Sequence, residues 1–235
     1  MKILALETSA VTASVAVTED EKLLAQSFQN SGLTHSATLM PMVADLLKNT
    51  GLKLEDMDVI AVSAGPGSFT GIRIGVAAAK GLAWPGDKLC APCSTLESMA
   101  WQCAHMEGEI CAVMDARRKQ VYNARFLAHD GKLTRLTADR AIGVDELIHE
   151  VQSSGKTQIL VGDGSALCST AFEQAGVPFA VMPPHLVCQT AWGVARAALE
   201  LAHAGQLVPA GQLTPQYHRL SQAERERLER EKKEN

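Results

Sequence analysis

The chain alternates between two hydrophobic periods, and the order in which they change predicts its secondary structure. Short continuous or alternating apolar runs predict strands, whereas apolar positions three and four residues apart predict helices. In the first half, the pattern predicts strands at 2–7, 14–17, 22–28, 58–63 and 88–91, and helices at 34–50, 70–84 and 95–105. This half therefore begins with three strands and continues with alternating helices and strands.

The second half repeats this order of elements without repeating the residues. The pattern predicts strands at 109–114, 121–127, 133–137, 158–162 and 179–182, and helices at 144–153, 166–175 and 189–204. Two βββαβα units in tandem indicate a duplicated α/β fold with a cleft between the halves. We expect an N-terminal subdomain at 1–106, a C-terminal subdomain at 107–220 and a charged tail at 221–235.

The amino-acid composition indicates which broad class of protein this chain belongs to. Apolar residues make up 46% of the 235 positions and charged residues 20%, which is typical of a globular chain. The net charge of −4 disfavours direct nucleic-acid binding as the main function, although a local basic patch is compatible with it. No apolar run approaches the roughly 18 residues of a membrane span. We therefore expect a cytoplasmic protein with its six cysteines reduced and mostly buried.

The segment 63–75, SAGPGSFTGIRIG, places a glycine-rich loop between a strand and a helix, an order found in many phosphate-binding sites. It is not GxGxxG, because Thr70 occupies the sixth position, and no Gly-Lys-Ser/Thr follows to make a P-loop. Pro66 also removes one backbone N–H donor. A tight turn with close helix–strand packing is therefore at least as well supported as phosphate binding.

The helix after this loop carries small residues on one flank, at Gly71, Gly75, Ala78, Ala79 and Gly81. An interior glycine costs about 0.5–1 kcal/mol of helix stability relative to alanine, a cost that close approach of another backbone would offset. From composition alone, we expect the backbone that packs against this flank to belong to the same chain rather than to a second protein.

The helix at 34–50 has a broad apolar surface. The expected core face consists of Leu39, Met42, Val43, Leu46 and Leu47. Met40 and Ala44 broaden the apolar surface beyond this single stripe. A helix that is apolar on more than one side either lies deep in the fold or contacts a partner.

Four other signals are weak. Cys90 and Cys93 form a lone CxxC pair without the second pair of a zinc site, and the HExxH-like segment at 149–153 ends in serine. The turn at 161–165, VGDGS, fits either an adenosine contact or a simple strand–helix turn. The basic hairpin at 115–119 fits either a polyanion contact or a solvated turn.

Five segments together give the chain a resemblance to a known family. They are LALETS at 4–9, SAGPGSFTGIRIG at 63–75, STLE at 94–97, MDARR at 114–118 and PQYHR at 215–219. In this order they resemble the family of the bacterial tRNA threonylcarbamoyladenosine biosynthesis protein TsaB. The resemblance implies the duplicated actin-like/Hsp70-like ATPase (ASKHA) fold, which agrees with the two βββαβα units.

The resemblance also implies a function and a set of partners. Members of this family are non-catalytic paralogues of TsaD, which transfers a threonylcarbamoyl group to adenosine 37 of tRNAs that read codons beginning with A. They act as scaffold subunits in a heterodimer with TsaD, joined in a larger complex by the small ATPase TsaE. We therefore expect an indirect contact with tRNA, a homodimer when the partner is absent, and no cofactor except a possible nucleotide at the heterodimer interface.

Two differences from the paralogue support a non-catalytic role. Its first loop carries two carboxylates after ETS, where this chain has Val11 and Thr12. Its two histidine metal ligands correspond to Thr95 and Met99, which cannot form a site for a hard metal ion. We therefore expect no catalytic residue and no metal ligand in this chain.

The resemblance also implies that the helices at 34–50 and 71–84 form the surface that binds the partner. This implication replaces the earlier expectation that the small flank packs against the same chain. The expected interface residues are Leu39, Met42, Val43, Leu46, Gly71, Arg73, Gly75, Ala78 and Ala79. The expected family-motif residues are Glu7, Thr8, Ser9, Gly65, Pro66, Gly67 and Asp115. The alternative is an ATP-dependent enzyme active on its own, suggested by the cleft and the Gly162-Asp163-Gly164 turn.

Overall fold

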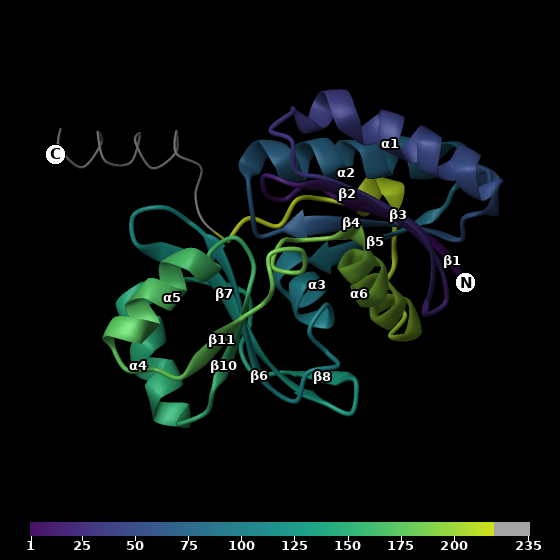
Figure 1. Cartoon of the computed structure of the whole chain (residues 1–235). Coiled ribbons are helices and arrows are strands. Elements are labelled where there is room, and N and C mark those ends of the chain that lie inside the picture. The colour runs from purple at the N-terminus through teal and green to yellow at the C-terminus, as the bar shows by residue number, and fades with distance from the viewer. Residues whose placement is uncertain (219–235) are drawn as a thin grey trace, which may run out of the picture.

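The computed structural model describes residues 1–218 and contains two six-stranded sheets, one in each half of the molecule (Figure 1). The first has the order β12-β5-β4-β1-β2-β3. Its strands are β1 (Lys2–Glu7), β2 (Ala13–Glu19), β3 (Lys22–Gln29), β4 (Val59–Gly65), β5 (Leu89–Ser94) and β12 (Val208–Pro209). Strands β1, β2 and β3 pair antiparallel, whereas β4 and β5 run parallel to β1.

The second sheet has the order β11-β10-β6-β7-β8, and β9 pairs with another part of β7. Its strands are β6 (Gly108–Asp115), β7 (Gln120–His129), β8 (Lys132–Arg135), β9 (Arg140–Gly143), β10 (Gln158–Val161) and β11 (Phe179–Val181). An antiparallel hairpin, β6–β7, is again followed by parallel strands, here β10 and β11. The two halves therefore share one topology, as the repeated order of elements predicted.

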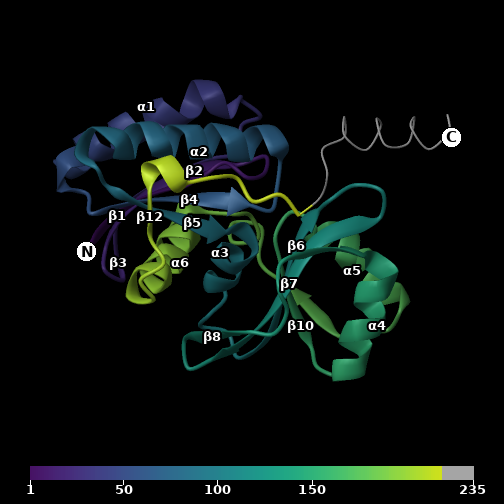
Figure 2. The same ribbon diagram turned by 180° about the vertical axis from the view of Figure 1, so that it is seen from behind.

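Helices cover both faces of the first sheet. Helices α1 (His35–Thr50) and α2 (Phe69–Ala83) lie on one face, and α6 (Ala191–His203) lies on the other, next to α3 (Thr95–Trp101) (Figures 1 and 2). Successive side chains of β1 point to opposite faces of the sheet. Leu4 and Leu6 therefore lie in the core under α1 and α2, whereas Ile3 and Ala5 lie in the core under α6. This places the N-terminus of α2 at the edge where β1 and β4 end.

In the second half, α4 (Val144–Ser154) and α5 (Ser165–Gln174) cover one face of the sheet. Three short 3₁₀ helices complete the described elements: η1 (Leu54–Asp56), η2 (Trp84–Gly86) and η3 (Ala210–Gln212). All six cysteines are free and five are buried, including Cys90 and Cys93 in β5, so the CxxC pair belongs to a strand. No helix within residues 1–218 is both long and apolar enough to cross a membrane.

The order of elements inferred from the sequence is confirmed, with three exceptions. The four-residue strand β9 and the two-residue β12 were missed. Helix α3 ends at Trp101, earlier than the expected residue 105. The charged tail expected at 221–235 lies outside the described residues.

The expected assignment of 107–220 to the second half does not hold for α6 and β12, which belong to the first half. Helix α6 packs on β1, β2 and β5 through small side chains such as Ala191, Ala195 and Ala198. At Gly193, an added Cβ would lie closer than 3.0 Å to the Ser98 carbonyl oxygen, so the absence of a side chain lets α6 approach α3. The chain therefore returns to its first sheet before it ends.

Candidate functional site

The glycine loop is packed against the ETS segment of its own chain. The Ser68 N–H donates a hydrogen bond to the Ser9 carbonyl oxygen at 2.7 Å, and the Thr8 hydroxyl donates to the Gly71 carbonyl oxygen at 2.8 Å. A Cβ at Gly67 would lie closer than 3.0 Å to the same Ser9 oxygen. One side of the loop is thus occupied by the end of β1, where a phosphate-binding loop would present free N–H groups.

The small flank of α2 faces this segment. An added Cβ would lie closer than 3.0 Å to the Thr8 carbonyl oxygen at Gly71, and to the Thr8 hydroxyl at Gly75. Both glycines are buried, so they admit the chain's own β1–β2 loop. The prediction that they allow a partner helix to approach is therefore wrong, because Thr8 already fills that space.

Glu7 lies at the bottom of this site with a fully buried side chain. One carboxyl oxygen accepts the Ser9 N–H at 2.5 Å, and the other accepts the hydroxyl of Ser63. Burial raises the pKa of Glu7 above its usual range, although the hydrogen bonds from Ser63 and Ser9 act to lower it. The folded protein therefore favours the neutral carboxyl more strongly than the unfolded chain does.

Glu7→Gln should make the protein more stable than the wild type near pH 8 and leave the two similar near pH 4. A raised carboxyl pKa in the folded state means that stability falls as the pH rises above the unfolded value of 4.5. The amide keeps an acceptor for Ser9 and cannot ionise. Urea unfolding at both pH values measures the effect, with exposed Glu146→Gln as the matched control. If the difference in unfolding free energy between Glu7→Gln and the wild type were the same at both pH values, ionisation of Glu7 would not be its cause.

The other side of the loop is covered by residues 213–218, here called the C-terminal strap. The Gln216 N–H donates to the Ala64 carbonyl oxygen at 2.7 Å, and a Cβ at Gly65 would lie closer than 3.0 Å to the Gln216 carbonyl oxygen. The yellow strap leaves the first sheet beside α2 and runs toward the second half (Figure 2). The loop is thus enclosed by two distant segments of the same chain.

Tyr217 fixes the strap to the start of α2. Its ring stacks on Phe69 with centroids 4.1 Å apart, and its hydroxyl accepts a hydrogen bond from Arg73 Nε at 2.8 Å. The Arg73 guanidinium lies 5.1 Å from the Phe69 ring centroid and 5.6 Å from that of Tyr217. Arg73 is exposed, as an interface residue must be, but it already has these internal partners.

The other residues expected at the partner interface differ in how much of each side chain is exposed to solvent. Leu39, Val43, Leu46 and Ala79 are buried in the core between the helices and the first sheet. Their apolar area is therefore used inside the chain, and the prediction that they supply area to a partner is wrong. Met42 and Ala78 are half-buried. The outward faces of α1 and α2 instead carry Ala37, Met40, Ala44, Ala77, Gly81 and, just after α2, Trp84.

The second half places Asp115 apart from the other motif residues, at the exposed end of β6. Its carboxylate accepts the Arg117 N–H at 2.7 Å, within a hairpin where Arg117, Arg118 and Lys119 all have positive φ. In the turn after β10, the Gly164 N–H donates to the Val113 carbonyl oxygen at 3.1 Å. This turn therefore packs on β6.

The positions that correspond to the paralogue's ligands lie in packed surroundings. Thr95 and Met99 are fully buried at the start of α3, and Met99 belongs to the core of the second sheet. The Thr12 hydroxyl donates to the Gln189 carbonyl oxygen at 3.3 Å, whereas Val11 is exposed. A thioether and two hydroxyls are poor ligands for a hard cation, so these residues do not fit a catalytic metal.

Comparison with known proteins agrees with this geometry. Residues 23–231 match the family described as "TsaD: tRNA N6-adenosine threonylcarbamoyltransferase". A relative from Bacillus subtilis (strain 168), named tRNA threonylcarbamoyladenosine biosynthesis protein TsaB, is 31% identical over 235 residues, which cover 99% of this chain and all of the relative.

Two solved structures have folds similar to that of this chain. The structure named YeaZ from Pseudomonas aeruginosa superimposes with a TM-score of 0.78 at 25% identity, covering 92% of this chain and 99% of that one. The ROK hexokinase from Thermus thermophilus shares the actin-like fold, with a TM-score of 0.51 at 12% identity over 87% of this chain and all of that one. With its duplicated actin-like/Hsp70-like ATPase fold, the chain belongs to the TsaB family.

Proposed function

We propose that this protein is a non-catalytic subunit in the biosynthesis of threonylcarbamoyladenosine at position 37 of tRNA, and that it binds a TsaD-type catalytic subunit. One observation is the main support for the proposal: the chain has the ATPase fold, but packed side chains and backbone fill the places where a catalytic relative would bind metal and nucleotide. Thr95 and Met99 are buried where metal ligands would stand, and Ser9 and Gln216 enclose the glycine loop. The names of the relatives supply the pathway.

We place the partner on the outward faces of α1 and α2, here called the docking face: Ala37, Met40, Ala44, Ala77, Gly81 and Trp84. Met40 on α1 and Trp84 just after α2 are 44% and 69% exposed, and these two helices pack side by side. Exposed apolar side chains indicate an interaction site when they gather in one patch. The small side chains between Met40 and Trp84 would let helices of a partner approach closely. An exposed aromatic residue beside such a surface is typical of an interface anchor.

Gly81→Leu should weaken the complex with the TsaD-type subunit at least tenfold, a loss of about 1.4 kcal/mol. A Cβ at Gly81 meets nothing within 4 Å, so leucine would project into the partner without disturbing this chain. Sedimentation of the purified chain, alone and mixed with the catalytic subunit, measures the association. Ala166→Leu, which adds leucine to an exposed position on α5, is the matched control.

The same pair of variants tests the role in cells that lack the native gene. Gly81→Leu should restore less tRNA threonylcarbamoyladenosine than Ala166→Leu. If Gly81→Leu binds the catalytic subunit and supports modification as well as the wild type does, the docking face is wrongly placed. If the wild-type chain does not associate at micromolar concentrations, the scaffold role itself fails.

The proposal assigns no cofactor to the isolated chain and leaves any nucleotide to the interface with the catalytic subunit. It includes a TsaE-type ATPase in the larger complex, an indirect contact with tRNA, and self-association through the docking face when the partner is absent. ATP hydrolysis by the purified chain, lost on Asp163→Ala, would instead support an independent enzyme. Enclosure of the glycine loop by Ser9 and Gln216 argues against that alternative.

A further inference from the structure

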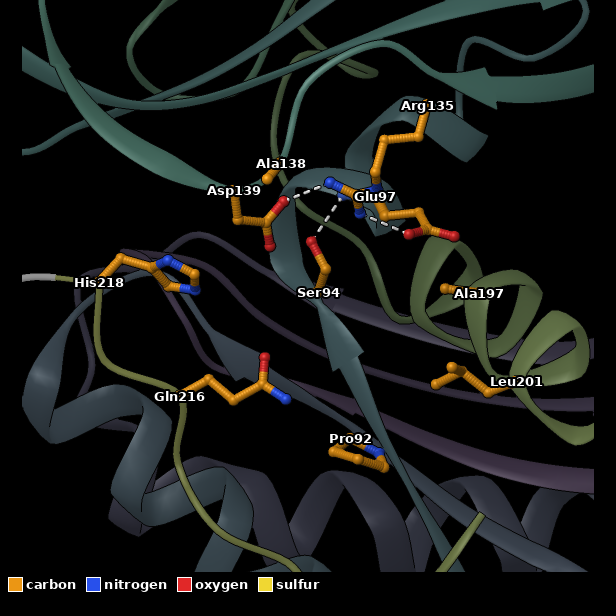
Figure 3. Close-up of a pocket in the computed structure, with 10 residues that line it drawn as sticks. All are labelled: Pro92, Ser94, Glu97, Arg135, Ala138, Asp139, Ala197, Leu201, Gln216 and His218. Carbon is orange, nitrogen blue, oxygen red and sulfur yellow. Dashed lines mark hydrogen bonds and ion pairs between the residues drawn. The ribbon is translucent and has the colours of Figure 1, made fainter. Parts of the chain in front are cut away.

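A cavity of about 330 Å³ lies between the two halves, away from the docking face (Figure 3). Four separate parts of the chain form its walls: the β5–α3 junction, the connection from β8 to β9, helix α6 and the C-terminal strap. The proposed scaffold role uses none of its polar side chains.

Among residues 1–218, one guanidinium lines the cavity, that of Arg135, and it is held by two carboxylates. Arg135 Nη2 lies 2.5 Å from Glu97 Oε2, and Arg135 Nη1 lies 2.6 Å from Asp139 Oδ1. The guanidinium carbon also lies 4.7 Å from the Phe126 ring centroid. Because the one positive charge is shared between two negative charges, these three groups leave the cavity wall with one excess negative charge.

Several acceptor groups face the cavity from different walls. The Asp139 side chain is only 9% exposed, and one of its oxygens is bound to Arg135 while the carboxylate borders the cavity. The amide of Gln216 and the ring of His218 point toward the same space (Figure 3). Ser94 also lines the cavity, and its hydroxyl oxygen accepts a hydrogen bond from the Glu97 N–H at 3.1 Å. Pro92, Ala197 and Leu201 form an apolar end (Figure 3).

We propose that this cavity binds a small organic cation, a primary ammonium group on a short aliphatic body. An ammonium group has three N–H donors and no acceptor, which complements the carboxylate of Asp139 and the oxygens of Gln216 and Ser94. The aliphatic body would cover Leu201 and Pro92. A zwitterion is disfavoured, because its carboxylate would meet Glu97 and Asp139 while Arg135 is already paired.

The C-terminal strap completes the site. Gln216 and His218 line the cavity, whereas Tyr217, between them, turns to the opposite side and stacks on Phe69. This alternation is the geometry of an extended chain. Loss of the Tyr217 contact should therefore weaken ligand binding, although Tyr217 does not line the cavity.

Calorimetric titration of the full chain with n-butylammonium tests the proposal. We expect saturable binding with a Kd of about 1 mM, and much weaker binding of n-butanol and butyrate. Asp139→Asn should raise the Kd about tenfold or more, because it removes the excess negative charge. Asp87→Asn, an exposed substitution in the turn between η2 and β5, should leave the Kd unchanged.

Two further variants separate the site from a general loss of structure. Leu201→Phe should block binding by filling the apolar end with the charges intact, and Tyr217→Ala should weaken binding severalfold while Tyr217→Phe weakens it less. Absence of saturable binding at tens of millimolar overturns the proposal. Equal binding of n-butanol, or an unchanged Kd in folded Asp139→Asn, overturns it as well.

Discussion

Gly71→Ala is expected to destabilise the protein by about 3 kcal/mol, although alanine is the better helix former. The new Cβ would lie closer than 3.0 Å to the Thr8 carbonyl oxygen, a backbone atom that cannot rotate away. Relief of the overlap would separate α2 from the end of β1 and stretch the hydrogen bond from the Thr8 hydroxyl to the Gly71 carbonyl oxygen. Urea unfolding monitored by circular dichroism measures the loss.

Two other glycines in α2 supply a graded comparison. At Gly75, the closest atom is the Thr8 hydroxyl oxygen, which a rotamer change can move, so Gly75→Ala should cost less than Gly71→Ala. At Gly81, an added Cβ meets nothing within 4 Å, so Gly81→Ala should stabilise the protein by about 0.5 kcal/mol. Equal effects at the three positions would show that close packing against Thr8 does not determine the need for glycine.

Glu109→Ala should also destabilise the protein by about 3 kcal/mol, because it leaves a buried arginine without its carboxylate. Arg125 Nη2 lies 2.5 Å from Glu109 Oε2, and the two side chains are 10% and 6% exposed. Gln158 Nε2 donates to the same oxygen at 3.1 Å, and Lys156 Nζ lies 3.2 Å from Oε1. The matched control is Glu107→Ala, which removes an exposed ion pair with His129 and should cost less than about 1 kcal/mol.

The cost of Glu109→Ala should shrink as the solution is acidified. Burial alone would raise the pKa of Glu109, but the hydrogen bonds from Gln158, Arg125 and Lys156 outweigh it and hold the pKa below its usual value of 4.5. A lowered carboxyl pKa contributes stability that is present above the unfolded pKa and is lost as the pH falls through the folded pKa. A difference between variant and wild type that stays constant from pH 7 to pH 3 would contradict this linkage.

The sequence predicted the order of elements well because hydrophobic periodicity is local. The apolar run of β1 lies within six residues and the apolar stripe of α1 within sixteen, so each element could be recognised without its neighbours. The C-cap of α1 at Gly51, with φ of 69°, was also predictable from glycine alone. Strand β9 was not predictable in this way, because its sequence RAIG has only two apolar residues side by side and leads directly into α4.

The candidate site was predicted only in part. The sequence identified the glycine loop and the ETS segment, but it gave the wrong neighbour for Gly71 and Gly75. The apolar period predicted Leu39, Val43 and Leu46 as a core face, but the resemblance then assigned them to the partner, since a core stripe and an interface stripe have the same period. The sequence placed Gly81 on the small flank with Gly71 and Gly75 but not among the expected interface residues, because only its exposure in the folded chain distinguishes it from those two glycines.

By itself, the sequence determined the duplicated α/β order of elements and the motifs that give the resemblance to the family. Those features depend on residue type and short spacing. The tertiary structure alone decided that Thr8 contacts Gly71, 63 positions away, that Gln216 closes the loop beside Ala64, and that α6 returns to the first sheet. Such contacts follow from the path of the chain through two sheets, and no local pattern of side chains records that path.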